Sequence, residues 1–595
     1  MQNEEKKRYG KWIIAGIVVV CLLACAAVIM ISHKGNQSGA DAFDAYMDDL
    51  FKEEIVQNTI NLHYTLAYPE NYGITNYDVF LGDYSIENME ESYQELKEIK
   101  EKLLTFDVEE LTESQQLTYD VLMDYVETEL SVEDLLFYTE VLGPTTGYQA
   151  QLPIILAEYT FRTKQDIEDY LALIAQVDEI YAEIIEFEEA KADAGLFMSD
   201  EAADAIIEQC EGFIEEPEEN YMIEIFNDKI DSFEGLSEEE KEEYREKNYT
   251  IITTEVVDGY QTLIDGLTEL KGSGTNELGL CYFEDGKKYY KYLVRTKTGS
   301  DVSIKKQQKR IENYLEGFFQ SLYNVASENP EIFSDVLDYQ FPDMEPDEIL
   351  QDLIEKTGED FPEPPQVDYT IKYVHPSMQE HLSPAFYLTT PIDDIQNNLI
   401  YINEKYTGTN AGGNSELYTT LAHEGYPGHL YQNAYTASCD LPLVRNLLSY
   451  GGYTEGWATY VEYEYSYKYI VKDEALADFL AANTAASLAV YAYIDLSVHY
   501  DGWDRADVSD FLALYFPVDE ETVNEIYDRI VQDPANYLSY FIGYLEFLEL
   551  RETAEKKLED NFDVKDFHAF LLSTGPAPFY IIEDYMQEWI EQQQE

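Results

Sequence analysis

Two histidines and two glutamates are of the types that the site of a metal-dependent hydrolase needs, and they lie close together in the sequence. His423 and His429 flank Glu424, and Glu455 follows after 25 intervening residues. Two imidazoles and a carboxylate form a zinc ligand set whose fourth position is open to water, and a carboxylate beside the first histidine can accept that water's proton. This is the chemistry of HExxH peptidases. The pattern favours Zn²⁺ bound by His423, His429 and Glu455, with Glu424 as general base.

The spacing of the two histidines differs from HExxH. His423 and His429 are six residues apart, which separates their side chains by about 120° around a straight helix. Asn414 and Ser415 are good helix starters, so Pro427 is expected deep inside a helix, where it forces a kink or bulge. Such a break could turn His429 back toward His423. On spacing alone, the alternative is two ordinary histidines at a helix break.

The wider pattern resembles a known family. His423-Glu424-x-x-Pro427-Gly428-His429-x-x-Gln432, followed by Thr454 to Ala458, is similar to the signature of the bacterial family called domain of unknown function 885. Further segments that resemble this family are Leu62 to Gly73, Gly286 to Tyr290, Asp495 to Trp503, Ser539 to Arg551, Phe567-His568 and Gly575-Pro576. The family is similar to gluzincin metallopeptidases, the group that includes thimet oligopeptidase. The resemblance implies a mostly helical fold, a deep active-site cleft, and Glu455 as third zinc ligand on the next helix.

Apolar residues recur at spacings of three and four through most of the chain, which predicts a mostly α-helical fold. Clear examples are 86–104, 165–193, 237–270, 303–327 and 474–492. Two places favour β structure instead: an Asp-Gly turn between aromatic residues at 282–290, and two β-rich runs at 384–403. We expect a hairpin at each, the second directly before the active-site helix.

The body is predicted to be one helical domain in two halves. Residues 41–370 are assigned to a helical scaffold, and residues 371–595 to the half that carries the metal site. No linker rich in Pro, Gly or Ser separates them.

The N-terminal segment predicts a membrane anchor. Residues 12–32 are uncharged and long enough to cross a bilayer, and basic residues gather in 1–11, which places that end in the cytoplasm. Residues 33–40 form a polar linker. A cleaved signal peptide and a lipoprotein signal that lipidates Cys25 are the alternatives. All three place the body outside the cytoplasm.

The composition of the chain limits the kinds of molecule that the body of the protein is expected to bind. With 119 acidic and 38 basic residues, the formal charge is −81. Because phosphate binding requires clustered Lys and Arg, nucleic acid and acidic membrane surfaces are not expected as partners of the body. The body contains only Cys210, Cys281 and Cys439, so no disulfide framework is expected.

Peptide hydrolysis also needs a donor for the carbonyl oxygen that gains negative charge. The candidates are His499, which Asp495 could orient from four residues earlier on a helix, and Tyr540, on a helix that could return to the site. The alternative for Tyr540 is simple packing, since the chain has 52 tyrosines. Structural roles are expected for the other histidines of the body, which are His63, His375, His381 and His568.

These observations lead to one hypothesis and one rival. The hypothesis is a membrane-anchored, extracytoplasmic zinc peptidase that acts on short peptides, with the hairpin at 384–403 offering an edge strand to its substrate. The rival is a catalytically silent surface protein that binds a peptide or wall fragment in the same cleft. The sequence does not distinguish an endopeptidase from a carboxypeptidase. It also does not indicate the oligomeric state.

Overall fold

The computed structural model describes residues 39–594, apart from 333, 335, 337, 338, 340, 380, 381, 407–416 and 516. The predicted anchor at 12–32, the cytoplasmic residues 1–11, the alternative lipidation site Cys25 and most of the linker therefore lie outside the described residues. So do His381 and the expected helix starters Asn414 and Ser415.

The prediction of a mostly helical fold is confirmed. The helices of the first 360 residues are α2 (Gly39–Ile55), α3 (Thr59–Thr65), α4 (Ile86–Leu103), α5 (Glu113–Leu130), α6 (Tyr148–Glu158), α7 (Lys164–Ile174), α8 (Val177–Asp193), α9 (Asp200–Ile214), α10 (Tyr221–Ser232), α11 (Glu238–Ile251), α12 (Val257–Leu270), α13 (Gly286–Thr298), α14 (Ile304–Glu328) and α16 (Pro346–Asp360). Those that follow are α17 (Leu417–Glu424), α18 (His429–Ala437), α19 (Gly451–Val461), α20 (Tyr467–Ile470), α21 (Glu474–Leu496), α22 (Arg505–Leu512), α23 (Glu520–Gln532), α24 (Asn536–Leu558), α25 (Val564–Thr574) and α26 (Phe579–Gln594).

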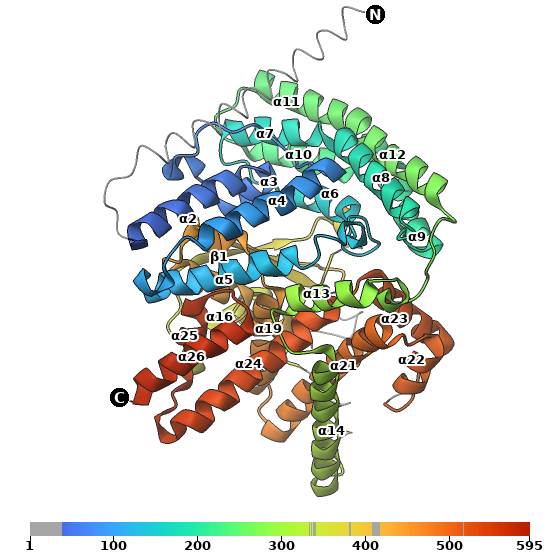
Figure 1. Cartoon of the computed structure of the whole chain (residues 1–595). Coiled ribbons are helices and arrows are strands. Elements are labelled where there is room, and N and C mark those ends of the chain that lie inside the picture. Colours follow the sequence, from blue (N-terminus) through green and yellow to red (C-terminus); the bar gives the residue numbers. More distant parts are fainter. Residues whose placement is uncertain are drawn as a thin grey trace, which may run out of the picture.

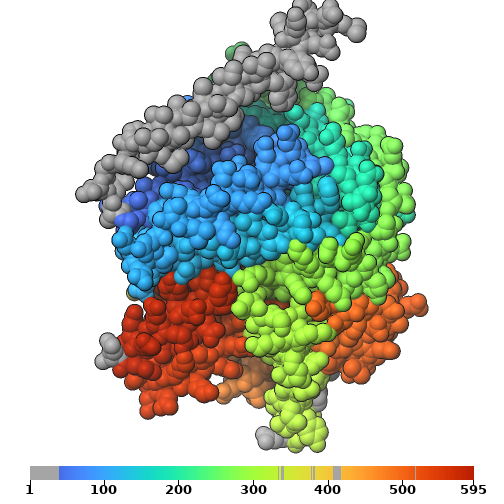
Figure 2. All heavy atoms as spheres, viewed as in Figure 1, coloured from blue at the N-terminus to red at the C-terminus, as the bar shows by residue number. Residues whose placement is uncertain are grey.

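The helices form two stacked regions. Figure 1 shows α2–α12 in the upper region and α16–α26 in the lower one, with α13 between them and α14 projecting downward. The space-filling view in Figure 2 shows the same order of colours and the same projection. One cluster of buried apolar residues lies within 60–267, and the largest runs from Val121 to Ile590. The proposed boundary at residue 370 falls inside strand β1, and the division into two halves stays a prediction.

A small mixed sheet lies beside helix α17. Its strands are β1 (Asp368–Tyr373), β2 (Ala385–Leu388) and β3 (Asn397–Ile402), in the order β1-β3-β2. β2 and β3 pair antiparallel, with Ala385 opposite Ile402, which confirms the hairpin expected at 384–403. β1 pairs parallel to β3. β2 is therefore an edge strand of the sheet.

The hairpin expected at 282–290 is wrong. A short 3-10 turn, η6 (Leu280–Tyr282), is followed by helix α13, whose N-cap residue is Asp285. The Asp-Gly pair therefore starts a helix instead of turning between strands. Gly286 is required there because a Cβ atom would lie 1.6 Å from the carbonyl oxygen of Leu280.

One described helical stretch, Glu474–Asp501, is long and apolar enough to cross a membrane by length and composition. Its residues Ala489, Ile494 and Leu496 are buried in the largest apolar cluster. We therefore assign it to the core of the body.

Candidate metal centre

A break between two helices brings the two histidines together. α17 ends at Glu424, and α18 begins at His429, so residues 425–428 form a loop where the sequence predicted a kink. The ring centroids of His423 and His429 lie 4.8 Å apart, with their planes at 87°. The six-residue spacing is thus compatible with one shared site, because no continuous helix separates the two side chains.

The loop is fixed by backbone packing. A Cβ atom on Gly428 would lie 1.8 Å from the carbonyl oxygen of His423, so only glycine fits. The indole N–H of Trp457 donates to the carbonyl of Pro427 at 2.9 Å, and the amide of Gln432 donates to Gly428 at 2.8 Å. The Trp457 contact ties the loop to α19, and the Gln432 contact closes the first turn of α18.

Glu455 on α19 completes a possible ligand set. Its Oε2 lies 3.6 Å from Nε2 of His423 and 3.5 Å from Nε2 of His429. One ligand atom from each of the three residues lies within 4.8 Å of the others. Ligands bound tetrahedrally to zinc at about 2.0–2.1 Å would be roughly 3.4 Å apart. The nitrogen and oxygen donors fit Zn²⁺ in chemistry, and the two distances to Glu455 are close to this spacing.

The three side chains also influence one another's ionisation. Burial alone would raise the pKa of Glu455, but the imidazoles of His423 and His429 lower it below its usual range. Burial alone would lower the pKa of His423, but the carboxylates of Glu455 and Glu462 raise it well above its usual value. Glu455 is therefore a carboxylate, the form that binds a cation.

Glu462 is a functional candidate that the sequence interpretation missed. Its Oε2 lies 3.0 Å from Nδ1 of His423 and so fixes the ring with Nε2 toward Glu455. Metal-binding histidines commonly donate their second ring N–H to such a carboxylate. Glu462 opens a π-helical turn, Glu462–Ser466, directly after α19. Its position seven residues after Glu455, on the same side of a helix, was the available signal.

Glu424 lies in the wall of a cavity of about 840 Å³ that His423, His429 and Glu455 also line. Its Oε2 accepts a hydrogen bond from the amide of Tyr387 on β2 at 2.9 Å. The expected general base, the three expected ligands and the edge strand thus meet at one cavity.

Tyr540 lines the same cavity, and its ring centroid lies 6.5 Å from that of His423. It is on α24, which approaches α19 closely because glycines face each other: a Cβ on Gly456 would lie 2.5 Å from the backbone of Gly543. Burial, and then the charges of Glu455 and Glu424, raise the pKa of Tyr540, which keeps its hydroxyl protonated and able to donate.

The expected pairing of Asp495 with His499 is wrong. Nδ1 of His499 accepts from the amide of Leu280 at 3.1 Å, and Nε2 donates to the carbonyl of Ile530 at 2.8 Å. Asp495 instead accepts from the hydroxyl of Tyr290. His499 is 0% exposed and is not among the residues that line the cavity. With both ring nitrogens engaged in the core, it has no place in the candidate site.

Three other histidines make structural contacts, as expected. His568 stacks on Phe361 and contacts the hydroxyl of Tyr460. His375 lies 3.7 Å from a carboxylate oxygen of Glu224.

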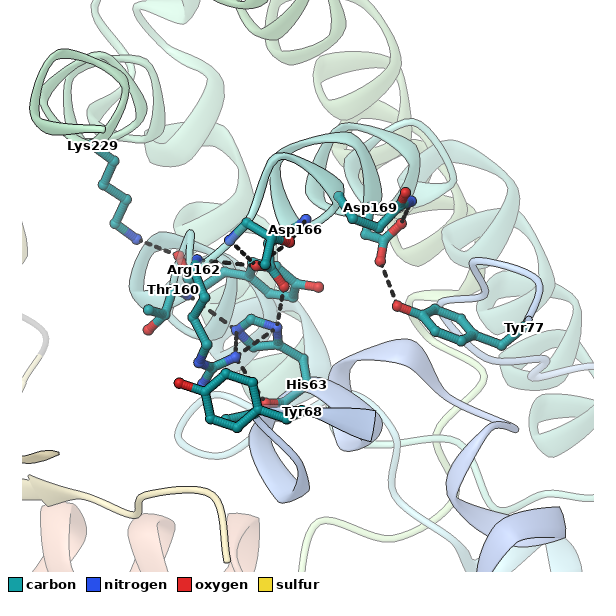
Figure 3. Close-up of polar contacts among 12 residues, drawn as sticks. His63, Tyr68, Tyr77, Thr160, Arg162, Asp166, Asp169 and Lys229 are labelled. Carbon is teal, nitrogen blue, oxygen red and sulfur yellow. Dashed lines mark hydrogen bonds and ion pairs between the residues drawn. The ribbon is translucent and has the colours of Figure 1, made fainter. Parts of the chain in front are cut away.

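Figure 3 shows the third of these, His63, between Arg162 and Asp166. The amide of Thr160 donates to its Nε2 at 3.2 Å. Burial lowers the pKa of His63 to about 4, so the ring is neutral. None of these residues lines the cavity.

Solved structures share the fold. The structure of a "putative lipoprotein" from Colwellia psychrerythraea covers 93% of this chain and 100% of its own, with a TM-score of 0.80 at 19% identity. A "putative lipoprotein of unknown function" from Shewanella oneidensis covers 91% of this chain and 99% of its own, with a TM-score of 0.63 at 16% identity. At these identities the likeness shows the fold alone.

Sequence comparison places the chain in a family. No curated protein matches this sequence. The family model described as "Bacterial protein of unknown function (DUF885)" matches residues 69–586, which include every candidate residue of the metal centre. Since this match extends over most of the sequence, the chain belongs to the DUF885 family of bacterial proteins.

Proposed function

We propose that this protein is a zinc-dependent peptidase that hydrolyses short peptides at the centre formed by His423, His429 and Glu455. The observation that carries the proposal is the convergence of these three side chains beside Glu424 in the wall of one cavity. The cavity volume of about 840 Å³ is within the range of roughly 300–1,000 Å³ typical of small-ligand sites. A short extended peptide suits it better than a folded protein.

Each residue has one task in this proposal. His423 and His429 would hold zinc through Nε2, and Glu455 would hold it through a carboxylate oxygen. Zinc in such a site lowers the pKa of a bound water to about 7. Glu424 accepts the proton of the attacking water on its carboxylate and delivers it to the nitrogen of the leaving amine. The hydroxyl of Tyr540 donates to the carbonyl oxygen of the scissile bond as negative charge develops there.

The edge strand β2 supplies the proposed substrate contact. Phe386 and Tyr387 of β2 line the cavity, and among the described residues β2 pairs only with β3. An extended peptide can therefore pair through main-chain hydrogen bonds with the groups of this outer edge other than the Tyr387 amide, which donates to Glu424.

We place the reaction outside the cytoplasm, with residues 12–32 as the anchor. The support is the basic segment before an uncharged stretch long enough to span a bilayer, together with the lipoprotein descriptions of the two proteins of similar fold. Lipidation at Cys25 would leave the body on the same side.

Metal analysis and kinetics of the full-length chain in detergent test the proposal. The wild type should bind about one zinc per chain, and His423→Gln and Glu455→Gln should lose it, whereas the control His375→Gln should keep it. Glu424→Gln should keep zinc, and its kcat on short peptides should fall about 10²–10⁴-fold. Zinc binding without hydrolysis by the wild type would favour the silent rival, and unchanged zinc in both ligand variants would refute the metal centre.

A further inference from the structure

The break between α17 and α18 separates the expected general base from the second histidine. In the HExxH pattern, the glutamate and the second histidine lie on one continuous helix, which fixes their relative positions. Here α17 ends at Glu424, and α18 begins at His429. Since no continuous helix joins these two residues, contacts from outside the two helices must hold Glu424 in place beside the metal ligands.

One such contact comes from the backbone of Tyr387 on β2. Its amide donates to Oε2 of Glu424 at 2.9 Å. Within the described part of the chain, we find no other hydrogen bond to this carboxylate. The bond occupies Oε2 and leaves Oε1 for the attacking water. The position of the Tyr387 backbone therefore decides where the carboxylate of Glu424 points.

The side chain of Tyr387 is anchored at its far end. Its hydroxyl donates to Oδ1 of Asn398 on β3 at 2.8 Å and accepts from Nδ2 of Asn433 on α18 at 3.0 Å. Asn398 is 1% exposed, and its own amide group donates to the carbonyls of Asp368 and Ile395 at 3.1 and 2.9 Å. The hydroxyl of Tyr387 thus lies between a buried acceptor from the sheet and a donor from α18.

Asn433 connects this contact to the metal centre. It is four residues after His429 on α18, so both side chains lie on the same face of that helix, and both line the cavity. Tyr387 therefore contacts the end of α17 through its amide and α18 through its hydroxyl. One residue of the sheet spans the break that separates Glu424 from His429.

We propose that Tyr387 is a positioning residue that holds the general base Glu424 in register with the metal-binding His429 across the helix break. The inference rests on the proposed peptidase function and deepens it. The contacts of Tyr387 replace the constraint that a continuous helix supplies in HExxH. Without its hydroxyl, the four-residue strand β2 loses its tie to α18, and its amide is no longer held at hydrogen-bond distance from Glu424.

Inhibitor binding to the zinc-loaded full-length protein tests this proposal without turnover. The probe is a short peptide hydroxamate, whose two oxygens bind zinc and whose acidic proton is shared with the general base. Tyr387→Phe should bind it about tenfold more weakly than the wild type, because the hydrogen bond to Glu424 is weakened. The matched control is Tyr401→Phe, which removes a hydroxyl from the neighbouring strand β3, where it contacts Glu158 away from the cavity-lining residues. The control should bind as the wild type does, and both variants should keep zinc.

A double-mutant cycle shows whether the effect passes through Glu424. In a Glu424→Ala background, Tyr387→Phe should change the affinity by less than about twofold, because the group that it positions is absent. A merely structural loss would weaken binding equally in both backgrounds. Asn433→Ala removes the other end of the contact to α18 and should repeat the pattern of Tyr387→Phe. It keeps the proposal testable if Tyr387→Phe folds poorly.

Two further measurements use turnover and structure. On a short peptide substrate, Tyr387→Phe should lower kcat about 10–10²-fold and change KM little, as expected for a misplaced base. Crystals of the metal-free Tyr387→Phe protein should show the carboxylate of Glu424 more than about 3.5 Å from the amide of residue 387. This readout requires neither metal nor activity.

The outcomes separate this inference from the proposed activity. Equal effects of Tyr387→Phe with and without the Glu424 carboxylate, or an unmoved Glu424 in the crystals, would overturn the inference even if the wild type hydrolyses peptides. A loss of affinity confined to the proteins that retain Glu424, together with a displaced carboxylate, would support it. That result would stand even if the wild type hydrolyses no peptide and the proposed activity fails.

Discussion

Oε2 of Glu462 lies 3.0 Å from Nδ1 of His423, on the side of the ring opposite the nitrogen that faces Glu455. The carboxylate thus fixes both the orientation of the imidazole and the nitrogen that is left for a metal. This contact joins the helical segment after α19 to the end of α17.

The first prediction concerns this contact. Glu462→Gln should weaken zinc binding about 10–100-fold, because a neutral amide orients and polarises His423 less well. Competition with a zinc chelator measures the effect. Glu464→Gln is the matched control, since Glu464 is two residues further on and accepts from Tyr544 instead. Equal affinities in the two variants would show that the Glu462 contact does not act on the metal.

The second prediction concerns Tyr540. Tyr540→Phe should lower kcat about 10²–10³-fold with zinc still bound and KM little changed, because the lost hydrogen bond forms only as charge develops. Steady-state kinetics with metal analysis measure this. Tyr537→Phe is the control from the same helix, where the ring stacks on Tyr491 and does not line the cavity. A normal kcat in Tyr540→Phe would show that Tyr540 contributes only to packing.

The third prediction concerns the loop between the histidines. Gly428→Ala should destabilise the protein by about 1–3 kcal/mol and abolish zinc binding, since the new Cβ would lie 1.8 Å from the carbonyl oxygen of His423. Gly212→Ala in α9 is the control: nothing lies within 4 Å of its Cβ, and it should stabilise the protein by about 0.5–1 kcal/mol. Urea unfolding and zinc titration measure both effects. Full zinc affinity in Gly428→Ala would contradict the proposed role of the loop.

The fourth prediction concerns pH and His499. Burial lowers the pKa of His499 to about 4, whereas an unfolded histidine has a pKa of about 6.5. The unfolded chain therefore binds more protons between these values, so the free energy of unfolding falls as the pH drops from about 6.5 toward 4. From this residue alone, the loss at pH 5 relative to pH 7.5 is about 2 kcal/mol.

His499→Gln isolates that contribution. Glutamine can accept from Leu280 and donate to Ile530 as the neutral ring does, but it does not titrate. The difference in unfolding free energy between wild type and variant should therefore change by about 2 kcal/mol between pH 7.5 and 5 in urea titrations. kcat should be unchanged. Parallel pH curves, or a large loss of kcat, would contradict the assignment of His499 to the core.

The sequence predicted the helical fold, and the structure brings the predicted side chains of His423, His429 and Glu455 together. Their residue types and motif order are local signals. The prediction failed where tertiary packing decided the structure. The Asp-Gly pair at 285–286 fits both a turn and a helix start, and contact with Leu280 selects the helix. Asp495 and His499 are four residues apart, but a π-helical turn at Ser497–Asp501 changes the local geometry.

Glu462 was missed for a related reason. It belongs to no compact motif, and its candidate role depends on its contact with His423, which lies 39 residues earlier in the chain. Such a partner can be recognised only when the packing of the helices is known.

Anomalous diffraction at the zinc absorption edge, on crystals of the zinc-loaded Glu424→Gln protein, tests the central claim most directly. The account predicts one strong peak within about 2.0–2.2 Å of Nε2 of His423, Nε2 of His429 and a carboxylate oxygen of Glu455. No peak at this position, or a zinc ion bound elsewhere while these three side chains remain without metal, would contradict it.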